Sequence, residues 1–300
     1  MAGPASATEQ LLVLWERLQP RFLVSIQRTE RKHMSPSSLV PPSKVERRRD
    51  LLEQLLPLVR AAGEAVLEVY ASDFAVRGKA DASPVTEADE KAEAIILRGL
   101  AQLAPDIPAV SEEAAAKGFV PDVDTTFWLV DPLDGTKEFV SRNGEFTVNV
   151  ALVEHGTPVL GVVLAPALGR IYAGAEGVGS VVEGACGSRS VSRVRAVPDH
   201  GLTVVSSRSH GDLAALDRFL VGRKIAASVN AGSSLKFCLV ASGQADLYPR
   251  FGRTMEWDTA AGHAVLRAAG GWVADLRGNE LGYGKPGFEN PHFVAFGVRV

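Results

Sequence analysis

The apolar residues of this chain follow a helical spacing in two consecutive stretches. Between residues 50 and 70 they recur at steps of three and four, which places them on one face of an α-helix. Pro57 either kinks this helix or marks its true beginning. A second helix is predicted over residues 87–103, with Thr86 as its N-cap and Asp89 three residues later. Two helices are therefore expected before residue 104.

Short apolar runs separated by Gly and Pro replace this spacing after Pro121, and they predict β-strands. The runs span residues 127–130, 146–153, 159–164 and 171–174, with a turn at His155 and Gly156. A strand at residues 203–206 begins a section in which strands and helices alternate. The helices of that section are expected at residues 212–220, 234–241 and 257–269, the last of them ended by Gly270 and Gly271.

These elements predict a layered sandwich, α+β in its first half and α/β in its second half. We place the boundary near residue 184, which gives an N-terminal domain over residues 50–183 and a C-terminal domain over residues 184–300. Residues 1–49 differ because they combine five prolines with two basic clusters and no sustained apolar period. We predict that they form a disordered basic extension, solvated rather than in peripheral contact with an anionic membrane.

Composition and charge narrow the class of protein. Hydrophobic residues make up 46% and charged residues 22%, as in globular proteins. No apolar run approaches the roughly 20 residues that span a bilayer, and no secretion signal is recognisable. The two cysteines, Cys186 and Cys238, lie far apart, which favours reduced thiols and a cytoplasmic location. A net charge of −3 argues against binding to nucleic-acid polymers.

The strongest chemical signal is the segment from Asp131 to Thr136, which follows an apolar run. Its two carboxylates, Asp131 and Asp134, could converge on a hard cation together with the carbonyl of Leu133. The N–H groups of Gly135 and Thr136 could then hold a phosphate oxygen. An ordinary turn at a strand end explains this segment equally well, because Asp, Pro and Gly all favour turns.

Three further acidic positions have ordinary explanations when each is taken alone. The pair Glu112 and Glu113 could be a solvated first turn, Asp258 could be a helix N-cap, and Asp89 could belong to a capped first turn. These separate explanations do not account for the combination of the motifs or for their order along the chain.

Together the motifs resemble the lithium-sensitive, magnesium-dependent phosphatase superfamily. It includes inositol monophosphatases, fructose-1,6-bisphosphatases and 3'(2'),5'-bisphosphate nucleotidases. Its pattern is a distant Asp, a Glu-Glu pair, Asp-Pro-x-Asp-Gly-Thr and Trp-Asp-x-Ala-Ala. Here these stand at residues 89, 112–113, 131–136 and 257–261. The resemblance covers roughly residues 50–296, and it implies an inositol-monophosphatase-like (sugar phosphatase) fold with alternating helix and sheet layers.

Within the superfamily the chain is most similar to the CysQ-type 3'(2'),5'-bisphosphate nucleotidases, through residues 79–86, 131–139, 207–210, 233–238 and 248–258. The resemblance implies two to three Mg²⁺ ions in the first domain and substrate binding in the second. The implied metal ligands are Glu112, Asp131, Leu133, Asp134 and Asp258. The implied catalytic residues are Glu112, Asp89 and Thr136. The implied substrate-binding residues are Gly135, Thr136, Lys79, Ser207, Ser234, Lys236, Arg250 and Asp258.

The predicted reaction is the hydrolysis of adenosine 3',5'-bisphosphate to AMP and phosphate by direct attack of metal-activated water, a task that the family performs in sulfur metabolism. The partner is then a small phosphorylated nucleotide, and the protein is a monomer or a homodimer. An inositol monophosphatase is the alternative, although Arg250 and Arg253 before Asp258 suit a second phosphate better. A non-catalytic metal- or nucleotide-binding protein is a remote alternative. It predicts that one of the family's five carboxylates is lost, but all five are present, at residues 89, 112, 131, 134 and 258.

Two other signals do not support a function. Residues 282–287 match a dinucleotide-binding fingerprint, but they contain Pro286 and have no helix after them, so we predict a loop. Ser207 and His210 lack the Gly-x-Ser-x-Gly elbow of a serine hydrolase.

Overall fold

The computed structural model describes residues 43–78, 84–207 and 212–298. Within these residues lie a seven-stranded sheet, a five-stranded sheet and the short hairpin of β1 (Arg77–Gly78) and β2 (Pro84–Val85). Lys79, residues 208–210 of the Ser207 motif and most of the predicted N-terminal extension lie outside the described residues.

Helix α2 (Lys44–Tyr70) begins six residues before the predicted start. Ser43 is its N-cap, and a capping box with Glu46 satisfies backbone N–H groups at both residues. The basic residues at 44–49, which we had assigned to the extension, are therefore helical. The helix also runs through Pro57, so that proline does not mark its beginning. No helix in the described part of the chain combines the length and the apolar character that a membrane span needs.

Helix α3 (Glu87–Leu103) matches the prediction, with Thr86 as its N-cap. Asp89 completes a capping box, because its Oδ2 accepts hydrogen bonds from the backbone N–H of Thr86 at 2.7 Å and from its hydroxyl at 2.8 Å. Helices α2 and α3 pack against each other and against the first sheet.

The first sheet has the strand order β3-β4-β5-β6-β7-β8-β9, and only the β3–β4 pair is parallel. Its strands are β3 (Ala109–Ser111), β4 (Thr126–Asp134), β5 (Thr147–Glu154), β6 (Thr157–Ala165), β7 (Arg170–Ala175), β8 (Gly179–Glu183) and β9 (Arg189–Ser192). The predicted turn between β5 and β6 is confirmed. His155 and Gly156 both have positive φ angles, 50° and 74°, as a tight hairpin turn between twisted strands requires.

The second sheet has the order β11-β10-β12-β14-β13, with β10 parallel to both of its neighbours. Its strands are β10 (Leu202–Ser207), β11 (Ile225–Ala231), β12 (Leu247–Arg250), β13 (Trp272–Asp275) and β14 (Phe293–Phe296). The helices of this half are α6 (Leu213–Leu220), α7 (Leu235–Ala241) and α8 (Ala260–Ala268), and α8 begins three residues after its predicted start. Short helical segments complete the described elements: α4 (Glu112–Ala116), α5 (Thr136–Val140), η1 (Pro166–Leu168) and η2 (Pro286–Phe288).

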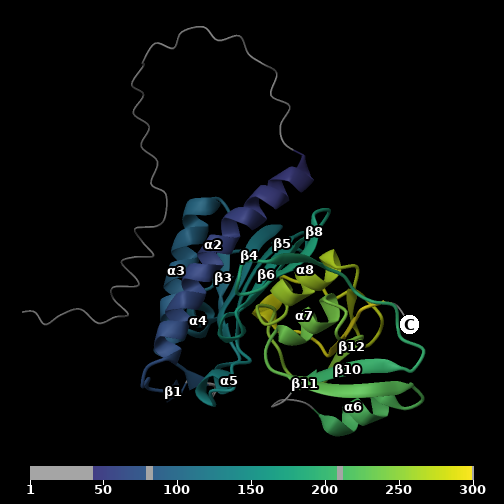
Figure 1. The fold of residues 1–300 in the computed structure, drawn as a ribbon. Helices are drawn as coiled ribbons and strands as arrows, with labels where there is room; N and C mark the ends of the chain where they lie inside the picture. Colours follow the sequence, from purple (N-terminus) through teal and green to yellow (C-terminus); the bar gives the residue numbers. More distant parts are fainter. Residues whose placement is uncertain (1–42, 79–83, 208–211, 299–300) are drawn as a thin grey trace, which may run out of the picture. The chain divides into compact units, whose positions relative to one another are not determined.

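Helix layers and sheet layers alternate through the molecule (Figure 1). Strand β5 shows how one strand serves two layers: Val148 and Val150 face α2 and α3, whereas Ala151 and Val153 face α7 and α8. Helix α8 lies close against the sheet, since a Cβ added at Gly161 would stand 2.5 Å from the carbonyl oxygen of Ala261. Helix α6 covers the far face of the second sheet through Phe219 and Leu220. The predicted layered fold is therefore confirmed.

The predicted domain boundary falls between two strands that pair in one sheet. Residue 184 lies between β8 and β9, which are antiparallel neighbours. Helix α8, from the predicted second domain, packs against β5, β6 and β7 of the first. The assignment of metal binding and substrate binding to separate domains stays a prediction.

Candidate active site

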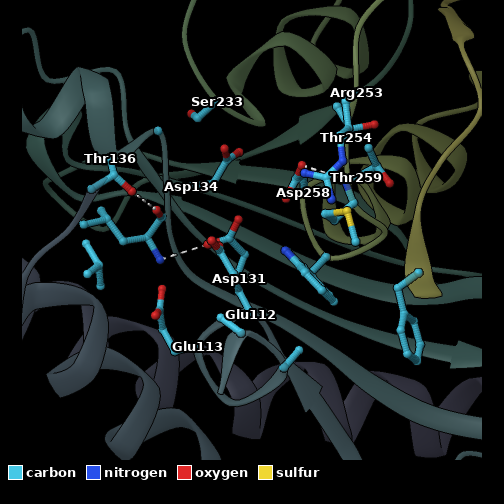
Figure 2. A pocket seen from close by; sticks show the side chains of 18 of the residues that line it. Glu112, Glu113, Asp131, Asp134, Thr136, Ser233, Arg253, Thr254, Asp258 and Thr259 are labelled. Carbon is cyan, nitrogen blue, oxygen red and sulfur yellow. Dashed lines mark hydrogen bonds between the residues drawn. The ribbon is translucent and has the colours of Figure 1, made fainter. Parts of the chain in front are cut away.

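Three carboxylates from distant parts of the chain converge at one end of the first sheet. One oxygen each of Glu112, Asp131 and Asp258 lies within 4.8 Å of the other two. Figure 2 labels the three side chains in the pocket. Glu112 begins α4, Asp131 lies near the end of β4, and Asp258 lies just before α8. Placing several negative charges together at a partly buried position is costly unless a cation balances them.

The segment at the end of β4 owes its shape to a break in the strand pairing. Asp131 is opposite Asn149 of β5, and the pairing shifts register before Asp134. The Oδ1 atom of Asp131 accepts a hydrogen bond from the backbone N–H of Leu133 at 3.0 Å, and the Leu133 carbonyl accepts one from the Thr136 hydroxyl at 3.3 Å. The sequence offered two explanations for this segment, a metal-binding site or an ordinary turn. The structure has the turn and the carboxylate cluster together, because the turn also places Asp131 in the cluster.

Gly135 allows the chain to turn directly after Asp134. Its φ angle is 88°, in the left-handed region that favours glycine. A Cβ at this position would also approach the carbonyl oxygen of Glu145 and the Cβ of Ser233 to 3.3 Å. Another residue here would strain the backbone that presents Asp134 and Thr136 to the pocket.

Burial acts on the carboxyls of both Asp258 and Asp134, and neighbouring carboxylates act on Asp258 as well. Burial raises the pKa of Asp258 well above its usual range, and the charges of Asp134 and Glu112 raise it further. Burial also raises the pKa of Asp134, although the charge of Lys236 and hydrogen bonds with Ser234 and Asn149 oppose this shift. Such a group of oxygen donors, unfavourable when ionised alone, suits a hard divalent cation such as Mg²⁺.

Asp258 is not a helix N-cap, contrary to the simplest explanation of its motif. Helix α8 begins at Ala260 with Thr259 at the N-cap position. The Oδ2 atom of Asp258 instead accepts a hydrogen bond from the backbone N–H of Met255 at 2.8 Å. This bond holds Asp258 in the loop that precedes the helix, where its carboxylate reaches the cluster.

Glu112 is held in place by Glu93, a residue that the sequence motifs did not predict to belong to the site. The buried carboxylate of Glu93, on α3, accepts hydrogen bonds from the Ser111 hydroxyl and, at 3.0 Å, from the Ala114 N–H. These bonds secure the first turn of the short helix α4, which carries Glu112. Burial raises the pKa of Glu93 above its ordinary value, and the two hydrogen bonds oppose that shift.

Asp89 and Thr136 occupy different kinds of position. Asp89 is almost fully buried in the capping box of α3, so the ordinary explanation of this residue holds. Thr136 lines the pocket. The implied action of Asp89 on an attacking water through Thr136 stays a prediction.

The cluster opens into a cavity of about 1080 Å³. The predicted residues Ser207, Lys236 and Arg250 line it together with Gly135 and the metal-ligand candidates. Basic and acidic side chains therefore share the wall, which suits a ligand with phosphate groups and metal ions. Lys79 lies outside the described residues, so its predicted role stays untested.

The two basic side chains nearest the cluster are largely buried. Lys236 donates hydrogen bonds to the carbonyls of Ala231 at 3.3 Å and Ser233 at 2.5 Å. Burial lowers its pKa to about 8, against the opposing effect of Asp134. Arg250 donates from Nη2 to the carbonyl of Arg253 at 3.0 Å. Both lie in the pocket wall rather than at its exposed rim.

Two residues of the site were missed in the sequence. Ser233, not Ser234, lines the cavity, because its φ angle of 44° turns the chain there and leaves Ser234 almost fully buried. No local signal distinguishes two adjacent serines. Asn149 contacts Asp134, and it did have a signal, since it is a polar residue between Val148 and Val150 in an apolar run.

Residues 282–285 of the dinucleotide-like segment form a loop, as predicted, and Pro286 and Gly287 begin the short helical segment η2. The N–H groups of Gly284 and Lys285 donate to the buried carboxylate of Glu256 at 2.6 and 2.9 Å. The Lys285 ammonium pairs with the same carboxylate at 2.6 Å. The segment thus anchors the chain beside Asp258.

Comparison with known proteins gives consistent matches over most of the chain. Residues 47–293 match the inositol monophosphatase family. The 3'(2'),5'-bisphosphate nucleotidase CysQ of Escherichia coli strain K12 is 51% identical over 247 residues, which are 81% of this chain and 98% of that protein. CysQ of Aggregatibacter actinomycetemcomitans is 36% identical, over 81% of this chain and 91% of that protein.

Two solved structures are similar to the fold. CysQ from Bacteroides thetaiotaomicron superposes with a TM-score of 0.70 at 35% identity, covering 84% of this chain and 98% of that one. An IMPase of Thermotoga maritima superposes with a TM-score of 0.68 at 26% identity, covering 83% and 92%.

Proposed function

The chain belongs to the inositol monophosphatase family, and we propose that it is a 3'(2'),5'-bisphosphate nucleotidase that hydrolyses adenosine 3',5'-bisphosphate to AMP and phosphate. The observation that carries this proposal is the 51% identity to a CysQ nucleotidase along nearly the whole of that protein. The cavity beside Glu112, Asp131 and Asp258 supports it, because it joins an acidic cluster to basic side chains.

We infer that Mg²⁺ is the ion at this cluster, with two to three ions held during turnover. The ligands would be the carboxylates of Glu112, Asp131, Asp134 and Asp258 and the carbonyl of Leu133. The observation that favours a cation is the convergence of Glu112, Asp131 and Asp258, whose carboxylate oxygens lie within 4.8 Å of one another. Bound magnesium supplies positive charge for the phosphate and a nucleophile from water at neutral pH.

The chain itself positions the phosphate and keeps the carboxylates in place. Gly135 and Thr136 line the cavity beside the end of β4, where their backbone N–H groups would hold a phosphate oxygen. The cysteines are unsuited to a nucleophilic role in this site. Cys238 is buried in the core and burial raises its pKa, while Cys186 is exposed and does not line the cavity. We therefore infer direct hydrolysis without a phosphoenzyme.

Arg250 is our candidate anchor for the second phosphate of the substrate. It lines the cavity and faces the same space as Asp258, whose charge it offsets. A guanidinium suits a phosphate because it can donate two parallel hydrogen bonds. An inositol monophosphate has no second phosphate to use this anchor, so substrate preference separates the two members of the family.

Phosphate release from a panel of substrates tests the proposal. With magnesium present, we expect adenosine 3',5'-bisphosphate to be turned over with a kcat/KM at least tenfold above that of inositol 1-phosphate. Excess chelator should abolish release, and lithium should inhibit it. A preference for inositol 1-phosphate would make the protein an inositol monophosphatase, and release in excess chelator would contradict the metal-based mechanism.

We also propose a cytoplasmic location, at most peripheral contact with a membrane, and a monomeric or homodimeric state. Light scattering on the purified protein and fractionation of cells test these points. A higher oligomer or a tightly membrane-bound protein would contradict them.

A further inference from the structure

Asn149 is an uncharged polar residue buried in the middle of β5. Its side chain is fully buried, and it faces the same side of the sheet as Ala151 and Val153. Its Oδ1 atom has no hydrogen-bond partner within the described part of the chain. An amide oxygen that is buried without a hydrogen-bond partner destabilises the fold. A core strand would be more stable with an apolar residue here, so stability does not explain why this position is an asparagine.

The Nδ2 group of Asn149 connects the cluster to its surroundings. Asn149 pairs directly opposite Asp131, so the two residues are cross-strand neighbours. Its Nδ2 group donates to Oδ2 of Asp134 at 3.3 Å and to the hydroxyl of Ser234 at 2.9 Å. The Ser234 hydroxyl in turn donates to the backbone carbonyl of Asp258 at 2.7 Å.

These hydrogen bonds form a path across the site, from the end of the first sheet to the loops before α7 and α8. Asp134 ends β4 of the first sheet, whereas Ser234 precedes α7 and Asp258 precedes α8. Asp134 and Asp258 carry like charges when ionised, so they repel each other. The neutral path through Asn149 and Ser234 can hold the Asp134 carboxylate and the Asp258 backbone at a set separation without adding charge.

We propose that Asn149, acting through Ser234, is a positioning residue that sets the separation of Asp134 and Asp258 for metal binding. This inference rests on the proposed function in that it takes the carboxylates as metal ligands. It also reassigns Ser234, whose buried hydroxyl serves the metal site instead of contacting substrate. Residues that orient metal ligands from behind typically change metal affinity or activity by about 10- to 100-fold when they are replaced.

The test measures Mn²⁺ binding by electron paramagnetic resonance of the free ion, without substrate, beside steady-state kinetics with Mg²⁺. For Asn149→Ala we expect the Kd for Mn²⁺ to rise about 10-fold or more and kcat to fall by a similar factor. The KM for adenosine 3',5'-bisphosphate should stay within about threefold, because no substrate contact is removed. A purely structural role would lower the melting temperature and leave the Kd of the folded protein unchanged.

Thr147→Val is the matched control. Thr147 lies two residues earlier on the same face of β5, is fully buried, and its hydroxyl has no hydrogen-bond partner within the described residues. The substitution keeps the shape and removes a polar group that bonds no ligand. Its Mn²⁺ affinity and kcat should stay within twofold of wild type. A loss as large as that of Asn149→Ala would overturn the inference.

Ser234→Ala keeps the inference testable if Asn149→Ala does not fold. It should also raise the Kd for Mn²⁺, and the double variant should lose no more than the larger single effect, because the two residues act in one path. Fully additive losses, or a folded Asn149→Ala protein with wild-type Mn²⁺ affinity, would overturn it. Wild-type protein that binds Mn²⁺ but releases no phosphate from the nucleotide contradicts the proposed function alone.

Discussion

At the scale of single residues, Asp131 belongs both to the carboxylate cluster and to the turn after β4. It is almost fully buried, belongs to the three-carboxylate cluster and accepts a hydrogen bond from Leu133. The same side chain therefore shapes the turn after β4 and supplies a candidate ligand. Its replacement should affect chemistry more than folding, because the turn can keep its hydrogen bond when the charge is lost.

Asp131→Asn should lower kcat by at least about 10³-fold, because it removes a charge between cations and keeps the size of the side chain. The melting temperature in chelator should stay within a few degrees of wild type. Phosphate release from adenosine 3',5'-bisphosphate and thermal unfolding measure the two effects. Near-normal turnover by folded Asp131→Asn protein would exclude this residue as a ligand.

Arg250→Ala should lower kcat/KM for adenosine 3',5'-bisphosphate by about 10- to 100-fold, the effect of losing roughly 1.5–3 kcal/mol of charge-assisted hydrogen bonding. Turnover of inositol 1-phosphate by the same variant should barely change. Arg253→Ala is the comparison: Arg253 also lines the cavity, but it is exposed and pairs with Glu289 at 3.2 Å, so its loss should lower kcat/KM less than the loss of Arg250. Equal losses on both substrates would show that Arg250 supports the fold or the metal site.

At the scale of elements, the first turns of α2 are attached to the sheet by a buried arginine. Arg48 donates to Glu176 at 2.6 Å and to Glu154 at 2.8 Å, and Lys44 pairs with Glu154 at 2.7 Å. Burial would raise the pKa of Glu154, but hydrogen bonds from Lys44 and Arg48 outweigh it and the pKa lies below the ordinary 4.5. The helix therefore begins where its charges find partners, not where its apolar period begins.

Arg48→Met should lower the free energy of unfolding by about 1–3 kcal/mol at pH 7, because it removes one of the two cationic partners of the partly buried Glu154 carboxylate. Since the pKa of Glu154 is lowered in the folded protein, this stabilisation is present above pH 4.5 and is lost as the pH falls through the lowered value. The difference between variant and wild type should thus shrink in denaturant titrations below pH 4.5.

The matched control is Arg49→Met, at an exposed position on the same turn. It should change the free energy of unfolding by less than about 0.5 kcal/mol. A difference between Arg48→Met and wild type that stays constant from pH 7 to acid would show that packing, not charge, accounts for the loss.

At the scale of the whole molecule, the site joins segments that are otherwise held apart by the layers. Glu112 and Asp131 belong to the first sheet and its edge, and Asp258 belongs to the layer of α7 and α8. A cation bound to all three links these segments only in the folded state. Binding should therefore stabilise the fold by mass action.

Magnesium at about 100 times its Kd should stabilise the folded protein by about 2.7 kcal/mol, which corresponds to a rise in melting temperature of roughly 4–5 °C for a chain of this size. Calorimetry with and without chelator at constant ionic strength measures the shift. Asp131→Asn should abolish most of it. An equal shift in wild type and Asp131→Asn would place the stabilising ion elsewhere.

The sequence by itself determined the element types and the chemistry of the motifs. Apolar spacing is a local property, so helix α3, the four strands of the first sheet's centre and the turn at His155 could be predicted from neighbouring residues alone. The acidic motifs likewise indicate oxygen ligands for a hard cation, because this property belongs to the side chains and does not depend on the fold. The layered architecture followed once those motifs suggested a known fold.

Only the tertiary structure decided which side chains meet. The start of α2 at Lys44 depends on Glu154, more than a hundred residues later, so no local window around Arg48 could reveal it. The exchange of Ser233 for Ser234 at the cavity depends on a backbone turn packed beside Gly135. The path from Asn149 to Asp258 likewise exists only because α7 and α8 pack on β5 and its neighbours, since contacts between distant segments are set by packing of the layers.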